Sequence, residues 1–335
     1  MASHKLFLLD VGHGNCSIVV NGDKLTVIDS PTGATLLETL ESLGATEIEN
    51  VLISHADADH IGGITNLLLD NNIRIKRVFV NPDSVKDTAV WYDFRCAVKD
   101  AATRGTTTTP ALTTTQSPDL SDDTVQFEVI APTPETALGG VGSQDLAGRS
   151  INSNSMSVVI RVLYKGVPVA LLPGDIDSAG LENLVAGGKL IQAKYFVYPH
   201  HGGLSKGSSV AFTTEICRLV SPQVVVLSIA RGGKYNNPRP EIISAICEVL
   251  PDAHIICTQL ATHCSKDVPP VTEHHCSFPA RGMSDQLCCG GTISIDFDRL
   301  DESPSEIHAD HIAFLDQVST PMCLSKGMKA VVPST

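Results

Sequence analysis

The stretch SHADADHIGG, residues 54–63, places two histidines and two aspartates within six positions. These potential metal ligands are His55, Asp57, Asp59 and His60. They follow Val51-Leu52-Ile53, an apolar run typical of a buried strand, and they precede a helical pattern that ends near Leu69. The cluster is therefore predicted to lie on a loop at the carboxyl end of a strand, where α/β proteins commonly carry their chemistry.

Three more segments end an apolar strand pattern with a polar side chain. Asp29 follows Leu25 to Ile28, Asp175 follows Val169 to Leu172, and His200-His201 follow Phe196 to Tyr198. Each alone has a simpler explanation, as a turn or helix-capping aspartate or as a hydrogen-bonded pair of core histidines. Together they predict that the side chains meet along one sheet edge, in a metal site built from imidazole and carboxylate ligands.

Strand-like and helix-like segments alternate along most of the chain. Strands are expected at 5–11, 16–20, 25–28, 51–54, 77–80, 125–130, 157–163, 169–172, 196–198, 224–229 and 292–297, and helices at 35–43, 63–69, 89–102, 179–185 and 239–250. Each half of the chain holds several strands, which favours two sheets packed between helices. The Thr-rich stretch from Thr103 to Ser121 is predicted to be an exposed loop, with a lid that faces the substrate as the alternative.

Composition limits the classes of partner. The net charge of -13 argues against broad, non-specific binding to a polyanion. With 42% apolar and 18% charged residues, the chain can bury a sizeable core. No run of ~18 apolar residues and no secretory signal pattern is present, so we expect a cytoplasmic protein with no membrane partner.

The ordered motifs resemble those of metallo-β-lactamase-fold hydrolases, and in particular the hydrolase domain of the DNA-uptake channel ComEC. The matching motifs are Asp10-Val11-Gly12-His13-Gly14-Asn15-Cys16, Ile28-Asp29-Ser30, Ser54 to Gly63, Asn152 to Val158, Leu171 to Ile176 and Pro199 to Gly202. The resemblance covers roughly Leu6 to Leu250. It implies an α/β fold of four layers (αββα), with two mixed sheets between helices. Residues 1–300 would form the hydrolase domain, and residues 301–335 a tail, with a helical pattern from Ile307 to Val318.

The resemblance also implies a centre with one or two metal ions. It assigns the first ion to His55 and Asp57 and the second to Asp59 and His60. Because many relatives have a histidine where Asp57 stands, the first position is richer in oxygen, which favours Mn²⁺ over Zn²⁺ without excluding zinc.

Other positions complete this centre by resemblance. Asp175 would lie between the two ions, and Asp59 and Asp175 would be the catalytic carboxylates. Either His200 or His201 would complete the ligand set, and the sequence leaves both open. Asp29 would orient a ligand histidine through a hydrogen bond.

Two motifs depart from the family. Gly203 stands where H-H-G is often followed by serine, and Ser205 comes two residues later. The family often has Y-G-H-P near the end, but this chain has Tyr235-Asn236-Asn237-Pro238. The missing histidine argues against strong nuclease activity.

Five of the ten cysteines fall between Cys257 and Cys289. In a reducing compartment such a cluster favours a metal over disulfides, although ordinary buried cysteines would give the same pattern. We expect a structural Zn²⁺ that clips the loop 257–290 onto the body. Its candidate ligands are Cys257, Cys264, Cys276, one of Cys288 or Cys289, and His274 as a substitute.

These expectations favour a metal-dependent hydrolase, most simply a phosphodiesterase or nuclease that uses metal-activated water on nucleic acid or a nucleotide. One alternative is a component of a multi-protein system, such as antiviral defence, that acts mainly by binding a protein partner. A second alternative is a lactonase or thioesterase on the same scaffold.

Overall fold

The protein is represented by a computed structural model that describes residues 3–203, 209–270 and 277–324. Its first sheet has seven strands in the order β13-β1-β2-β3-β4-β5-β6. They are β1 (His4–Leu8), β2 (Ser17–Asn21), β3 (Lys24–Ile28), β4 (Glu47–Leu52), β5 (Arg74–Phe79), β6 (Thr107–Thr109) and β13 (Ile293–Asp296). Strands β13, β1, β2 and β3 pair antiparallel, whereas β3, β4, β5 and β6 run parallel.

The second sheet repeats this arrangement with six strands in the order β12-β11-β10-β9-β8-β7. They are β7 (Val125–Ala131), β8 (Val159–Tyr164), β9 (Val167–Leu172), β10 (Tyr195–Val197), β11 (Val224–Leu227) and β12 (His254–Cys257). Strands β7, β8 and β9 pair antiparallel, and β9 to β12 run parallel. Each sheet thus has a parallel half whose strand ends can carry a site.

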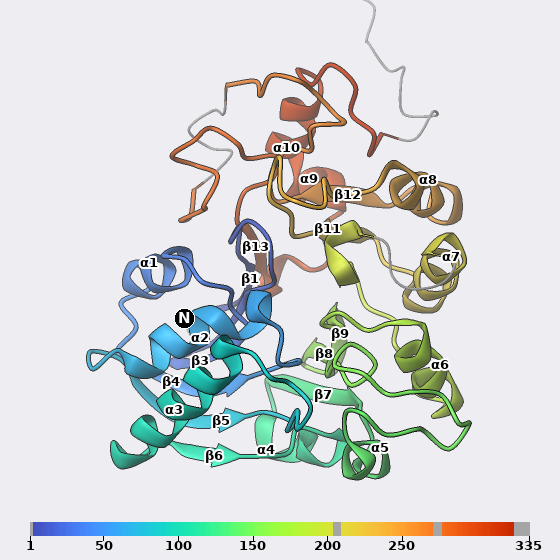
Figure 1. Cartoon of the computed structure of the whole chain (residues 1–335). Helices are drawn as coiled ribbons and strands as arrows, with labels where there is room; N and C mark the ends of the chain where they lie inside the picture. Colours follow the sequence, from blue (N-terminus) through green and yellow to red (C-terminus); the bar gives the residue numbers. More distant parts are fainter. Residues whose placement is uncertain (1–2, 204–208, 271–276, 325–335) are drawn as a thin grey trace, which may run out of the picture.

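Helices cover the outer face of each sheet (Figure 1). The first sheet packs on α1 (Thr35–Ser42), α2 (Ala58–Leu69) and α3 (Ala89–Thr103), and the second on α6 (Ser178–Ala186), α7 (Ser209–Val220) and α8 (Pro240–Val249). A third apolar core lies between the sheets and joins side chains such as Leu52 and Phe79 to Val162 and Val226. The predicted four-layer αββα architecture is confirmed.

The apolar pattern of the sequence explains these elements. Strand β11 reads VVVL and is buried throughout, as expected of a parallel strand covered on both faces. In α2, Ile61, Ile64 and Leu68 recur at helical spacing and face the first sheet.

The Thr-rich stretch differs from the predicted exposed loop. Residues Thr107–Thr109 form β6 at the edge of the first sheet, in parallel register with Arg77 to Phe79. A 3₁₀ turn (Thr114–Gln116) and α4 (Ser117–Leu120) follow. Threonine fits a half-buried pleated edge well, so local composition masked a strand that only its neighbour β5 stabilises.

The described part of the tail packs on the body. After the 3₁₀ turn Phe297–Arg299 come α9 (Pro304–Ile307) and α10 (Ala309–Leu315). Phe314, Leu315 and Val318 are buried in the outer core of the second sheet. The remaining short helices are α5 (Pro134–Gly139) and the 3₁₀ turn Pro199–Gly202. Within the described residues, no helix combines the length and apolar character needed to cross a bilayer.

The amino end of α2 is held against the loop after β3. The amide of Ser30 donates to the His60 carbonyl at 2.7 Å, and the amide of Gly63 donates to the Ser30 carbonyl at 2.9 Å. A Cβ on Gly63 would overlap the carbonyl oxygen of Pro31. This close approach sets the position of the helix that carries Asp59 and His60.

We therefore expect Gly63→Ala to lower the free energy of unfolding by about 1–3 kcal/mol, because overpacking forces the backbone apart. The exposed Asn66→Ala on the same helix is the control and should change stability by no more than about 0.5 kcal/mol. Urea unfolding of the metal-free protein measures both. Equal midpoints for the two variants would show that the helix can shift without loss.

Candidate metal centre

The loop from Ser54 to Asp57 connects β4 to α2, and Asp57 immediately precedes the helix. Asp59 and His60 lie in the first turn of α2, so the helical backbone sets their direction. The rings of His55 and His60 lie 4.1 Å apart between centroids. One short segment therefore directs several polar side chains to one place.

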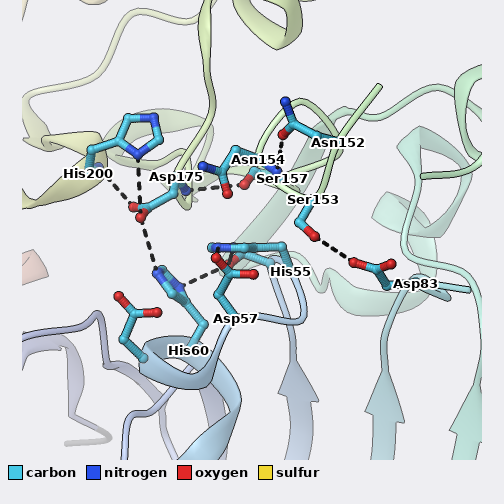
Figure 2. A network of polar contacts seen from close by, with 12 residues as sticks. His55, Asp57, His60, Asp83, Asn152, Ser153, Asn154, Ser157, Asp175 and His200 are labelled. Atoms are coloured by element: carbon cyan, nitrogen blue, oxygen red, sulfur yellow. Dashed lines mark hydrogen bonds and ion pairs between the residues drawn. The ribbon is translucent and has the colours of Figure 1, made fainter. Parts of the chain in front are cut away.

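The second sheet supplies the opposing side chains. Asp175 follows β9 and His201 follows β10, and these two strands are parallel neighbours. Gly174 has φ +56, and a Cβ there would clash with the side chain of Ser54, so the two strand ends approach closely. Figure 2 shows the Asp175 carboxylate between His60 on one side and His200 on the other.

Four side chains form a compact group of potential ligands. Asp59, His60, Asp175 and His201 each offer one ligand atom, and these atoms all lie within 4.8 Å of one another. The Nε2 atom of His201 lies 3.4 Å from Asp59 Oδ2 and 3.6 Å from Asp175 Oδ2. His60 Nε2 lies 3.7 Å from Asp175 Oδ2. Two imidazoles and two carboxylates at this spacing suit a divalent cation.

The hydrogen bonds behind the histidines orient their lone pairs into this group. His201 Nδ1 lies 3.0 Å from the carbonyl of Ser228, which can only accept, so Nδ1 carries the proton. His60 Nδ1 lies 2.8 Å from Asp29 Oδ2, and the same reasoning applies. The Nε2 atoms of both rings are buried and have no hydrogen-bond partner. A metal ion would satisfy both atoms, so the residues present fit such an ion.

Asp29 is the anchor of this arrangement. Its Oδ1 accepts from the backbone amide of Ser54 at 2.7 Å, and its Oδ2 accepts from the Ser54 hydroxyl at 2.5 Å as well as facing His60. The backbone of Asp29 has φ 56, a left-handed conformation that aspartate tolerates better than most residues. Asp29 thus contacts both Ser54 and His60, and its role as the acceptor that orients a ligand histidine stays a prediction.

Electrostatics also favours a cation at the group. Burial alone would lower the pKa of His60, but the Asp29 and Asp175 carboxylates hold that pKa well above its usual value. Burial alone would raise the pKa of Asp175, but His201 and His60 hold it well below its usual range. The raised pKa of His60 reflects the negative potential of these carboxylates, and the lowered pKa of Asp175 keeps that carboxylate charged, so both favour a cation at this point.

The two adjacent histidines have different surroundings. His201 belongs to the four-residue group, whereas His200 lies on the far side of Asp175, with Nδ1 3.6 Å from Oδ2. The His200 amide donates to Asp175 Oδ1 at 2.8 Å. Both residues have left-handed backbones, with φ 53 and 55, a strain that is common at functional sites.

His55 and Asp57 lie beside the group but outside it. His55 Nε2 is 3.8 Å from Asp57 Oδ2, and His55 Nδ1 is 3.0 Å from the Ser54 hydroxyl. Burial and the neighbouring His60 lower the pKa of His55 to about 3. The other oxygen of Asp57, Oδ1, is paired with the ammonium of Lys86. Their assignment to a separate metal ion stays a prediction.

Sequence reasoning missed His13, which lies in the turn Gly12 to Asn15 after β1. Its Nε2 is 3.3 Å from Asp59 Oδ2, and its ring packs 4.4 Å from that of His201 and 5.4 Å from that of Tyr235. The position of this turn at the end of β1 was a usable signal, because the turn belongs to the first matched motif.

A cavity of about 550 Å³ opens over the group. It is lined by His13, Asp57, Asp59, Asp175, His200, His201, Gly203, Lys234, Tyr235, Asn237 and Arg239. Lys234 and Arg239 thus supply positive charge beside an otherwise acidic site. Nearly all lining side chains are polar, which suits a polar or anionic ligand.

The structure describes only part of the predicted cysteine cluster. Cys257, Cys264 and Cys289 are buried in the outer apolar core of the second sheet. Cys288 Sγ instead faces Asp10 Oδ2 at 3.8 Å, and Cys289 Sγ lies 3.2 Å from His311 Nε2. Cys276 and His274 lie outside the described residues. Among the residues that are described, no group of three ligands includes a cysteine, and the structural zinc stays a prediction.

Residues 9–141 match the family described as the metallo-beta-lactamase superfamily. The chain is 24% identical to competence protein ComA of Neisseria gonorrhoeae over 235 residues. This match covers 68% of the chain and 27% of the relative. It is 22% identical to ComE operon protein 3 of Bacillus subtilis over 213 residues. This second match covers 63% of the chain and 24% of that relative. The chain therefore spans about a quarter of the length of these relatives.

One similar solved structure is Igni18, described as a novel metallo hydrolase from Ignicoccus hospitalis. The TM-score is 0.49 at 16% sequence identity, over 88% of this chain and 99% of that one. The predicted resemblance to ComEC-type proteins is matched by the weak homology to ComA and ComE operon protein 3.

The two histidines allow a paired test. His201→Ala should reduce metal affinity by more than about 100-fold, because it removes one ligand rather than an outer partner. His200→Ala, at a neighbouring position with the same backbone strain, should retain the ion. Isothermal titration of the stripped protein with Mn²⁺ and Zn²⁺ measures both affinities. A larger loss in His200→Ala would reverse the assignment.

Asp29→Asn tests the orienting acceptor. Asparagine keeps the shape and tolerates the left-handed backbone, but it cannot accept from both Ser54 and His60 in the same way. We expect metal affinity to fall by about 10–100-fold. Asp23→Asn, on an exposed turn, serves as the control with no change. Wild-type affinity in Asp29→Asn would show that His60 is oriented by packing alone.

Proposed function

We propose that this chain, which carries a metallo-beta-lactamase domain, is a metal-dependent hydrolase that cleaves phosphodiester bonds in nucleotides or short nucleic acid strands. The observation that carries the proposal is the pairing of a divalent-metal group with Lys234 and Arg239 in one cavity. A phosphodiester is anionic and offers oxygens to both kinds of positive charge.

The residues divide into holding and binding roles. Asp59, His60, Asp175 and His201 would hold one ion. When bound, that ion would supply Lewis acidity and make a bound water acidic enough to act near neutral pH. Asp29 and the Ser228 carbonyl hold the two ligand histidines in one orientation each.

The rim would bind the substrate. Lys234 and Arg239 supply cations for phosphoryl oxygens, and Tyr235, about half exposed, supplies an aromatic face on which a base can stack. The overall charge of -13 supports a small substrate or a short strand over a long duplex, which would need a basic track.

Two further features support this substrate class. One curated relative is named as a competence protein, and the motif series resembles the hydrolase domain of a DNA-uptake protein. Among the described residues that line the cavity none is aliphatic, whereas a lactonase or thioesterase needs an apolar wall for its acyl group. A role through a protein partner stays a prediction.

The proposal is tested by assaying the purified protein with Mn²⁺ or Zn²⁺ at low salt. Substrates are bis-p-nitrophenyl phosphate, short single strands, plasmid duplex, and a panel of lactones and thioesters. We expect turnover of the first two, slow cleavage of duplex and no turnover of the acyl substrates. Inactivity on every phosphodiester together with turnover of a lactone or thioester would overturn it.

The double variant Lys234→Ala/Arg239→Ala tests the rim. Loss of two charge-assisted contacts should lower kcat/KM for phosphodiesters by about 10- to 100-fold. The number of metal ions per chain should not change. Lys189→Ala removes one positive charge from an exposed position after α6, and it is the control for the loss of charge alone. Unaltered kinetics in the double variant would place the substrate elsewhere.

A further inference from the structure

Lys86 lies in the segment between β5 and α3 and was not part of any sequence motif. Its ammonium pairs with Asp57 Oδ1 and lies 3.1 Å from the hydroxyl of Ser153. The lysine side chain is only 18% exposed, so the ammonium makes a mostly buried ion pair rather than a surface one.

A second acidic residue fixes the position of Lys86. Asp83, which is 5% exposed, accepts from the Lys86 amide through Oδ1 at 3.0 Å and from the Ser153 hydroxyl through Oδ2 at 2.5 Å. Figure 2 shows Asp83 and Ser153 on the side of Asp57 away from His200. Two loops, one from each sheet, thus hold the lysine against Asp57.

Asp57 is the carboxylate that the motif offers to the first metal position. One of its oxygens faces His55 at 3.8 Å, and the other is paired with the ammonium. A divalent ion bound to Asp57 would lie within a few ångströms of a positive charge in a partly buried site, where repulsion is strong. Lys86 therefore competes directly with a metal ion for Asp57.

The first position is left incomplete among the described residues. Asp175 directs Oδ2 to the four-residue group, and its Oδ1 accepts from the His200 amide at 2.8 Å. The Asp59 group is the only set of three or more converging ligands in that part of the chain. His55 Nε2 is buried without a hydrogen-bond partner, so it would offer a ligand to a second ion once Asp57 is free of Lys86.

The charge at Asp57 agrees with this geometry. The Lys86 ammonium already neutralises the Asp57 carboxylate. A second divalent ion beside Asp57 would therefore add positive charge to a partly buried pair that is already balanced.

We propose that Lys86 takes the place of a second metal ion, so that the centre holds one divalent ion per chain. The inference rests on the proposed metal-dependent function, because it concerns the same site. Lys86 is a positioning residue, since it neutralises Asp57 and does not line the cavity.

The test counts metal ions and does not depend on a substrate. The full chain is stripped with a chelator, saturated with Mn²⁺ or Zn²⁺ and freed of excess ion, and metal per chain is measured by mass spectrometry. Wild type should hold one ion. Lys86→Met, which keeps the length of the stem and removes the charge, should hold two, and Mn²⁺ electron paramagnetic resonance should show a spin-coupled pair.

Controls separate charge from packing. Lys86→Arg should stay at one ion, as should Lys99→Met on the exposed face of α3. Asp57→Ala should also stay at one ion, whereas Asp59→Ala should hold none. Asp57→Ala keeps the inference testable if Lys86→Met does not fold.

Each metal count either supports or overturns the inference that Lys86 replaces a second ion. Two ions in wild type, or loss of the single ion in Asp57→Ala, would overturn the inference while leaving the hydrolase proposal intact. One ion in a folded Lys86→Met would also overturn it. One ion in wild type and two in Lys86→Met, with no phosphodiesterase activity, would support the inference and refute the proposed substrate class instead.

Discussion

The Asp29 carboxylate is the contact on which the site depends. It follows β3, yet it binds the amide and hydroxyl of Ser54 at the end of β4 and faces His60 in α2. Three consecutive elements of the first sheet are thereby held at fixed distances. Because the carboxylate is buried and accepts on both oxygens, a shift of any one element would leave polar atoms without partners.

The second sheet completes the centre because the two halves of the fold repeat the same order of antiparallel and parallel strands. The carboxyl ends of β3 and β4 therefore face those of β9 and β10 across the seam. Direct hydrogen bonds join the seam, from the Val158 amide to the Ser54 carbonyl at 2.9 Å and from the Ser228 hydroxyl to the Gly14 carbonyl at 2.6 Å. The ligand distances thus depend on packing between sheets as much as on either motif.

The cations at the edge of the site differ in sign from the net charge of the whole molecule. The chain is strongly acidic, but the cavity brings Lys234 and Arg239 to the edge of a carboxylate cluster. Lys86 adds a third cation behind Asp57. Local positive charge can draw a small anion into the cavity, while the net charge disfavours extended polyanions.

The sequence by itself determined the architecture and the ligand candidates. Apolar strands that each end in Asp29, His55, Asp175 or the His200-His201 pair predict polar side chains on shared sheet edges, and the motif order predicts the four-layer fold. Tertiary structure decided what depends on contacts between distant segments. It separated His201 from His200, because only one of two adjacent side chains can turn toward Asp59. It brought in Lys86 and Arg239, whose local sequence carries no signal of proximity, and it placed His13, from the first matched motif, beside Asp59. It also made a strand of the Thr-rich stretch, because an edge strand forms only where a neighbour offers its hydrogen bonds.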